Sequence, residues 1–147
     1  MANAKDLFTE EQLEDLKLVI KNAELDTSGE IRLHIEDKCN GEVMDRAAFI
    51  FDKLEMHKTD LRNGVLFYLA IKNRKFAIIG DIGINKLVPG NFWENIKINM
   101  LNKFRENQFL EGLSEGIQKA GEQLKKHFPH QVGDINELSD EISFGKG

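Results

Sequence analysis

The sequence predicts an α/β fold, a three-layer α/β/α sandwich built around a small mixed sheet of about four strands. Two apolar runs, residues 65–71 and 76–79, are joined by Lys72-Asn73-Arg74, whose turn chemistry predicts a tight hairpin. Apolar runs without polar alternation suit strands that helices cover on both faces. The chain as a whole follows the order helix, strand, helix, strand, strand, helix, helix, which is typical of such a sandwich.

The segment before the hairpin predicts two helices and a strand. Thr9-Glu10-Glu11-Gln12 has the pattern of a capping box, and a helical stripe of apolar residues continues from it to about Glu24. A second stripe with helical spacing covers residues 43–56. Between the helices, Glu30–Glu36 alternates strictly, which predicts a half-buried strand with one polar face. The apolar face carries Ile31, Leu33 and Ile35, and the polar face carries Arg32, His34 and Glu36.

Two further helices are predicted after the hairpin. Asn91 is placed as an N-cap, with Glu94 three residues later, for a helix over residues 92–104. The last helix covers residues 109–128 and ends at Pro129, which cannot continue it.

The size and composition fit one globular domain. The chain has 147 residues, of which 41% are hydrophobic and 31% charged, and nothing in it resembles a linker. We therefore expect a single domain over residues 1–130 and an acidic extension over residues 131–147. The acidic residues of this extension are Asp134, Glu137, Asp140 and Glu141.

The charge pattern restricts the partners. A net charge of −5, with basic residues dispersed among acids, argues against nucleic acid or an anionic membrane surface. No signal segment and no run of about 18 apolar residues is present, so we expect a soluble, cytoplasmic protein without membrane insertion. The single cysteine, Cys39, agrees with a reducing compartment. We expect a monomer whose partners are a divalent metal ion and a protein that the sequence does not identify.

Polar, glycine-containing segments bound the predicted hairpin at one end, residues 59–64 before the first strand and 80–85 after the second. A hairpin brings these segments together, so four oxygen-bearing side chains should share one edge of the sheet. They are Asp60, Asn63, Asp81 and Asn85. Carboxylate, amide and backbone oxygens are the ligands of hard divalent cations, and this set favours Ca²⁺ or Mg²⁺ over Zn²⁺. The alternative is that these side chains only cap turns.

Additional ligands could come from neighbouring segments. Glu30 begins the first strand, which starts at the same edge if it pairs in parallel with the second. Asp140 in the acidic extension is a further candidate. His57 could bind a metal or assist a proton transfer, but a solvated histidine at a helix end is the favoured explanation. For His34, a local charge network with its neighbours is favoured over catalysis.

Several short motifs together resemble the TPM domain family over about residues 8–129. The early ones are Thr9-Glu10-Glu11-Gln12-Leu13, Asn63-Gly64-Val65-Leu66, Arg74-Lys75 and the segment 80–85. The later ones are Phe104-Arg105 and Glu111-Gly112-Leu113. The chain is most similar to the branch whose members carry Met56-His57-Lys58-Thr59, Gly80-Asp81-Ile82-Gly83-Ile84-Asn85 and His127-Phe128-Pro129.

The resemblance implies an α/β/α sandwich that binds calcium in loops at one end of the sheet. Carried over by position, it assigns the metal to Asp60, Asn63 and Asp81. A plant member of the family has been associated with weak acid phosphatase activity. Typical members carry Glu in the third strand and a Gly-Tyr-Gly-Leu-Glu run after it, whereas this chain has Ile79 and Gly-Asp-Ile-Gly-Ile-Asn. This departure weighs against a phosphatase.

The sequence is compatible with three functions. The favoured one is a calcium-binding module, in which the metal orders the facing loops and so tunes the interaction with a partner. A metal-dependent, phosphatase-like hydrolase with weak activity is the alternative. A pure assembly domain without a metal is the third. We expect a binding module rather than an enzyme, because neither a nucleophile motif nor a convincing acid–base pair is present.

Overall fold

The hairpin predicted from the two apolar runs is the centre of the sheet. In a computed structural model, which describes residues 7–129 and 142–146, β2 (Gly64–Ala70) and β3 (Lys75–Gly80) are antiparallel neighbours. Every residue of β2 is buried, as expected for a strand that is covered on both faces. The turn between the strands holds Arg74 at a positive φ of 53°.

Two further strands complete a mixed sheet. β1 (Glu30–Glu36) pairs in parallel with β2, and β4 (Ser143–Gly145) pairs in parallel with the other edge of β1. The strand order is therefore β3-β2-β1-β4. The placement of Glu30 at the shared edge depended on a parallel pairing of β1 and β2, and this condition is met. β4 comes from the segment interpreted as an acidic extension.

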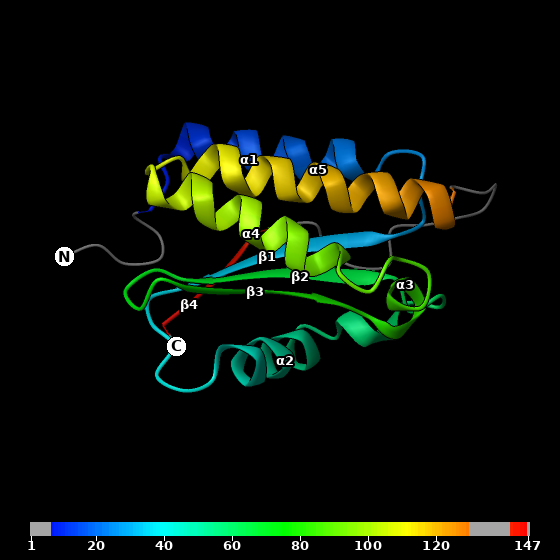
Figure 1. Ribbon diagram of the computed structural model, residues 1–147, viewed down its shortest axis with the longest axis horizontal. Coiled ribbons are helices and arrows are strands. Elements are labelled where there is room, and N and C mark those ends of the chain that lie inside the picture. The colour runs from blue at the N-terminus through cyan, green and yellow to red at the C-terminus, as the bar shows by residue number, and fades with distance from the viewer. Residues whose placement is uncertain (1–6, 130–141, 147) are drawn as a thin grey trace.

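Helices cover both faces of the sheet (Figure 1), which confirms the predicted sandwich. α1 (Glu10–Glu24), α4 (Phe92–Arg105) and α5 (Phe109–His127) lie on one face, and α2 (Val43–Lys53) lies on the other. The larger apolar core lies on the three-helix side, where the odd-numbered apolar residues of β1 contact the helices. A smaller core lies between the sheet and α2.

Local sequence signals explain where several elements begin. Thr9 and Gln12 form the predicted capping box, with the Thr9 hydroxyl accepting from the Gln12 amide at 3.1 Å and the Gln12 side chain accepting from the Thr9 amide at 3.0 Å. α5 ends at His127, two residues before Pro129, as predicted. Its end lies beside the start of β1, where the Thr27 hydroxyl donates to the Phe128 carbonyl at 2.5 Å.

Four expectations were wrong in detail. On the polar face of β1, His34 and Glu36 are buried rather than exposed, because they bond to each other and to Ser143 and Arg46 on neighbouring elements. Residues 80–85 are not all loop, since α3 (Ile82–Asn85) forms a helical turn there. Asn91 precedes α4 but makes no capping hydrogen bond, because its backbone, at φ −104° and ψ 11°, is not in the extended conformation of a cap. The predicted helix over 43–56 is shorter, with η2 (Met56–Lys58) as a separate 3-10 turn.

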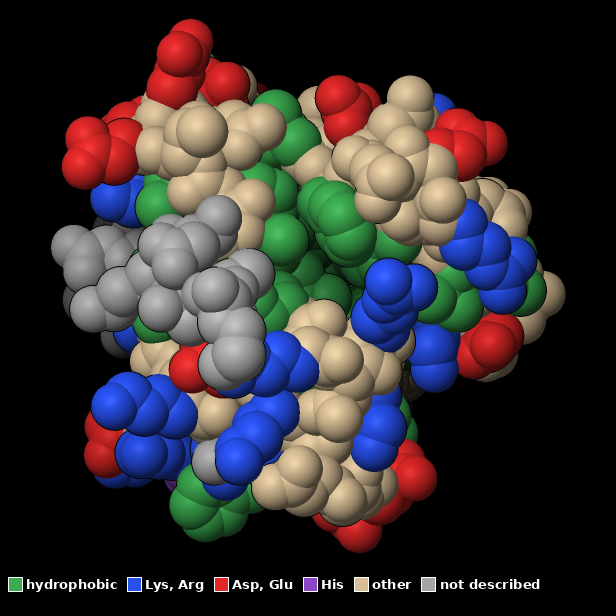
Figure 2. Space-filling model, turned by 90° about the vertical axis from the view of Figure 1, so that its left-hand side faces the viewer, with side chains coloured by type: hydrophobic (Ala, Val, Ile, Leu, Met, Phe, Trp, Pro, Cys, Tyr) green, Lys and Arg blue, Asp and Glu red, His purple; other side chains and the backbone are tan. Residues whose placement is uncertain are grey.

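The two ends of the sheet differ. The end with α3 gathers polar loops, whereas the hairpin end is hollowed, with hydrophobic side chains exposed in the hollow (Figure 2). None of the helices within residues 7–129 and 142–146 has the length and apolar character that a bilayer crossing requires.

Candidate functional site

Three chain segments meet at the end of the sheet where β1 and β2 begin and β3 ends. The strand register places Glu30 beside Gly64 and Val65 beside Gly80. The Asp81 amide continues this ladder by donating to the Gly64 carbonyl at 2.9 Å. The segments that carry the sequence-predicted ligands therefore share one edge, as the hairpin topology required.

Asp81 is buried and already paired at this edge. Its side chain caps α3 by accepting from the Ile82 amide at 2.8 Å. Arg62 binds both carboxylate oxygens, with Nε 2.7 Å from Oδ2 and Nη2 2.9 Å from Oδ1. The hydrogen bond to Asp81 raises the pKa of the Arg62 guanidinium. The Arg62 side chain is 42% exposed and that of Asp81 is 4% exposed. A metal cation that approaches Asp81 therefore competes with a guanidinium that can move out into solvent.

Asn63 leaves an oxygen without a partner. The residue is 1% exposed, and its amide nitrogen Nδ2 donates to the Ser28 hydroxyl at 3.3 Å. Its backbone amide donates to the Thr59 hydroxyl at 3.2 Å. The side-chain oxygen Oδ1 is buried and has no hydrogen-bond partner within the described part of the chain. An unpaired buried carbonyl is uncommon in folded proteins and calls for a water or a cation.

Asn85 is occupied by structural contacts. Its Nδ2 donates to the Gly80 carbonyl at 2.7 Å, and its Oδ1 accepts from the Trp93 indole at 2.7 Å. These bonds connect the end of β3 to α3 and α4, so Asn85 closes this edge of the sheet. Metal binding by its side chain would require both contacts to change.

The other predicted ligands differ in exposure. Glu30 is buried at the start of β1, whereas Asp60 is exposed in the loop before β2. His57 lies on η2 with Nδ1 3.6 Å from Asp52 Oδ1, which is too long for a hydrogen bond. Asp140 lies outside the described residues.

The donors at this edge fit a hard cation only in part. Within residues 7–129 and 142–146, no three His, Cys, Asp or Glu side chains come together in a metal-binding arrangement. Calcium, however, accepts amide, backbone and water oxygens beside carboxylates. The unpaired Asn63 oxygen, together with Asp60 and Asp81 from the adjoining segments, supplies that chemistry.

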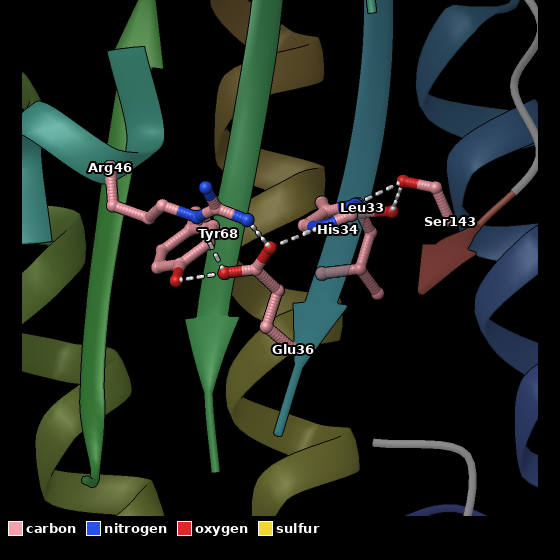
Figure 3. Close-up of polar contacts among 6 residues, drawn as sticks. All are labelled: Leu33, His34, Glu36, Arg46, Tyr68 and Ser143. Atoms are coloured by element: carbon pink, nitrogen blue, oxygen red, sulfur yellow. Dashed lines mark hydrogen bonds and ion pairs between the residues drawn. The ribbon is translucent and has the colours of Figure 1, made fainter. Parts of the chain in front are cut away.

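A second polar group, the buried carboxylate cluster, lies on the α2 side of the sheet (Figure 3). It consists of Glu36, His34, Arg46, Tyr68 and Ser143. Glu36 Oε1 accepts from Arg46 Nη2 at 2.5 Å and lies 3.2 Å from His34 Nε2. Its Oε2 accepts from the Tyr68 hydroxyl at 2.5 Å and from Arg46 Nε at 3.0 Å. His34 Nδ1 lies 2.6 Å from the Ser143 hydroxyl on β4.

The electrostatics of this cluster follow from burial and pairing. Burial works to raise the pKa of the Glu36 carboxyl, but the hydrogen bonds from Arg46, Tyr68 and His34 outweigh it and hold that pKa below its ordinary value. Burial lowers the pKa of His34 despite its bond to Glu36. Burial and the bond to Glu36 both raise the pKa of the Tyr68 hydroxyl. The cluster therefore holds a buried carboxylate that is ionised at neutral pH beside a neutral imidazole.

The order Ser143, His34, Glu36 matches that of a nucleophile, a base and an orienting carboxylate. Arg46 already balances the charge of Glu36, and burial disfavours the imidazolium that such a base must become. The contacts instead join β4, β1, β2 and α2, which favours a structural role. The sequence predicted a local network between His34 and its neighbours, and the contact between His34 and Glu36 confirms it.

The sequence did not reveal the partners of the two buried acids, Asp81 and Glu36. Arg62 lies within the candidate segment, but its pairing with Asp81 was not foreseen. Arg46 and Tyr68 fall within the helix predicted over residues 43–56 and the apolar run over residues 65–71, where no polar role was predicted for either. One feature of the sequence could have indicated these partners. A central strand that is covered by helices buries its polar side chains, and buried polar side chains need hydrogen-bond partners.

Comparison with known proteins is consistent with this architecture. The profile of the TPM domain family matches residues 1–123. No curated protein matches the sequence. The NMR structure of the BA42 protein from the psychrophilic bacterium Bizionia argentinensis is similar over 99% of this chain and 100% of that one, with 41% identity and a TM-score of 0.89.

Two more distant structures share the fold alone. The N-terminal domain of a protein from P. gingivalis has 20% identity and a TM-score of 0.69, covering 85% of this chain and 83% of that one. The N-terminal domain of the cg2496 protein from Corynebacterium glutamicum has 7% identity and a TM-score of 0.62, covering 92% of this chain and 79% of that one. With the profile match over most of its length and the motifs described above, this chain belongs to the TPM domain family.

Proposed function

We propose that the protein is a divalent-cation-binding module that takes Ca²⁺, with Mg²⁺ as the competing ion, at the α3 end of its sheet. The observation that carries this proposal is the buried Asn63 oxygen without a partner, at the point where three chain segments meet. A hard cation satisfies such an oxygen, and the adjoining Asp60 and Asp81 supply negative charge.

Arg62 occupies the place of a cation at Asp81. Its guanidinium binds both carboxylate oxygens while its side chain as a whole remains partly exposed. An incoming ion takes over the carboxylate and releases the arginine to solvent. Binding therefore changes the loop that carries Arg62, and this change is the proposed signal to a partner.

The same end of the molecule exposes apolar side chains that suit a protein partner. Leu61 is 53% exposed and Ile82 52% exposed, and the two segments that carry them are joined by the hydrogen bond from the Gly83 amide to the Arg62 carbonyl at 2.8 Å. Neighbouring exposed apolar side chains are a common feature of protein interaction surfaces. Rearrangement of Arg62 would alter the surface that Leu61 and Ile82 present.

Calorimetric titration of EDTA-treated protein with Ca²⁺ and with Mg²⁺ tests the proposal. Asp81→Asn keeps a capping oxygen for α3 but removes the charge, so we expect Ca²⁺ binding to weaken about tenfold or more. Arg62→Gln removes the competing guanidinium and should strengthen Ca²⁺ binding about fivefold. Glu122→Gln, an exposed substitution on α5, is the matched control and should change nothing.

The location of binding is tested separately by amide chemical shifts. Titration with Ca²⁺ should move the signals of residues 59–64 and 80–85, including Leu61 and Ile82. Absence of both heat and shift changes at millimolar metal would refute the proposal. A Ca²⁺ affinity that is unchanged by Asp81→Asn would place any binding elsewhere.

A further inference from the structure

The hairpin end of the sheet, opposite the candidate cation site, contains a cavity of about 930 Å³. Its floor is apolar and is formed by Leu7, Leu69, Ile71, Phe76, Phe104 and Phe109. Figure 2 looks onto this end and shows hydrophobic side chains at the bottom of a hollow, with Lys and Arg side chains gathered along one side of it. The volume lies within the range of small-molecule binding pockets.

The floor is built from two turns that face each other. Phe76 at the start of β3 meets Phe104 near the end of α4, with ring centroids 5.4 Å apart. Phe104 in turn lies 5.1 Å from the Phe109 ring at the start of α5. Leu69 and Phe76 belong to the core, whereas Phe104 and Phe109 are only partly buried. The cavity is therefore a continuation of the apolar core that opens to solvent.

Among the described residues that line the cavity, every charged side chain is basic. They are Lys72, Arg74 and Arg105, and all three are exposed. Within the described part of the chain, neither Lys72 nor Arg74 belongs to an ion pair. These three cations, with no acid among the described lining residues, form a local positive potential on a chain whose net charge is −5.

Arg74 is held at this rim in an unfavourable backbone conformation. Its φ of 53° lies in the left-handed region, which glycine or asparagine would occupy at lower cost. Departures of this kind often mark places where a side chain is retained for function. At this position an arginine side chain adds a cation to the mouth of the cavity.

We propose that this cavity binds a free single-chain amphiphile with an anionic head, of the long-chain carboxylate class. The hydrocarbon chain lies on the aromatic and aliphatic floor, and the carboxylate meets Lys72 and Arg74 at the rim. This site is independent of the proposed cation site, since the two lie at opposite ends of the sheet (Figure 1).

Two other classes of occupant fit less well. A peptide would bring several amide groups into the cavity, whereas Asn107 is the one neutral polar side chain among the described residues that line it. A bilayer contacts flat or protruding surfaces, and the apolar groups here lie inside a hollow on a net acidic chain. A hydrocarbon chain with one anionic head needs no further polar partners.

Titration of the isotope-labelled full chain with dodecanoate, below the concentration at which it forms micelles, tests this assignment. We expect amide shift changes in residues 69–76 and 104–109. Octanoate should bind about tenfold or more weakly, because four methylene groups fewer are buried. Dodecyltrimethylammonium, which has the same chain length and the opposite charge, should also bind more weakly than dodecanoate.

Two exposed substitutions test the basic rim without disturbing the core. Lys72→Gln and Arg74→Asn should each weaken dodecanoate binding about threefold to fivefold. Arg74→Asn suits the left-handed backbone at this position, so the variant should fold at least as well as the parent. Lys86→Gln, an exposed substitution just after α3, is the matched control and should bind as the parent does.

Equal affinity for dodecanoate and dodecyltrimethylammonium would overturn the proposal, as would shift changes confined to other parts of the chain. Unchanged binding in both rim variants would also overturn it. Sedimentation of the protein with phosphatidylglycerol vesicles, without any response to monomeric dodecanoate, would assign the surface to a membrane instead.

Discussion

Replacement of Glu36 by glutamine is the sharpest test of the buried carboxylate cluster. The carboxylate is 1% exposed and is bonded by Arg46, Tyr68 and His34. Glutamine has the same shape but no charge, and its amide nitrogen cannot accept the hydrogen bonds that one carboxylate oxygen now receives. The variant therefore leaves buried donors without an acceptor while the packing is preserved.

The magnitude follows from the exposure of the partners. Removal of one member of a buried ion pair costs about 3–5 kcal/mol of unfolding free energy. The Arg46 side chain is 29% exposed and can turn towards water, so the lower part of this range applies. We expect Glu36→Gln to lose about 3 kcal/mol, which corresponds to a fall in melting temperature of about 6–12 °C for a chain of this length.

Urea unfolding at pH 7.5, followed by Trp93 fluorescence, measures this loss. Tyr68→Phe should cost about 1.5–3 kcal/mol in the parent, because it removes a hydrogen bond to a charged acceptor. The same substitution should cost at least about 1 kcal/mol less when Glu36 is already glutamine. Glu122→Gln, which is exposed, should stay within about 0.5 kcal/mol of the parent. A loss below about 1 kcal/mol for Glu36→Gln would refute the view that this carboxylate joins the sheet to α2.

Two further predictions concern pH and backbone packing. Because burial lowers the pKa of His34 in the folded protein, the unfolded chain takes up that proton first as pH falls below about 6.5, and stability is lost from there towards the folded pKa. His34→Gln should therefore flatten the decline of urea midpoints between pH 7.5 and pH 5, and an unchanged slope would contradict this role. Gly83→Ala places a methyl group 2.0 Å from the Leu61 carbonyl oxygen, so the two joined loops must separate at a cost of about 2–3 kcal/mol. Gly41→Ala, whose added methyl group has no heavy atom within 4 Å beyond the adjoining residues, is its control in thermal unfolding, and equal melting temperatures for the two variants would count against this close approach.

Local signals in the sequence were sufficient for most of the secondary structure. The capping box at Thr9, the apolar runs of the hairpin and Pro129 each act within a few residues of the boundary that they mark. Asn91 shows the limit of such signals, because a side chain caps a helix only if its own backbone is extended, and distant packing sets that backbone. α3 was missed for a related reason, since four residues are too few to show a helical period.

The candidate site was likewise predictable in part from the sequence. Chain connectivity alone required that the segments before β2 and after β3 meet, and the register confirms it. The pairing of Asp81 with Arg62 and the commitment of Asn85 to Trp93 could not be predicted, because both depend on side-chain directions that only the folded loops define. Alternation along β1 identified its polar residues correctly but not their burial.

The sequence by itself determined the order of the elements and the hairpin, because these depend on short-range pattern. The parallel pairing of β1 with β2 remained a condition until the sheet was seen. Only the tertiary structure decided which charges are neutralised. Hydrogen-bond partners such as Glu36 and Arg46, or Asp81 and Arg62, are chosen by distances of a few ångströms between segments. The basic mouth of the hairpin-end cavity has the same origin, since Arg74 and Arg105 come together only when the turn after β2 faces the turn after α4.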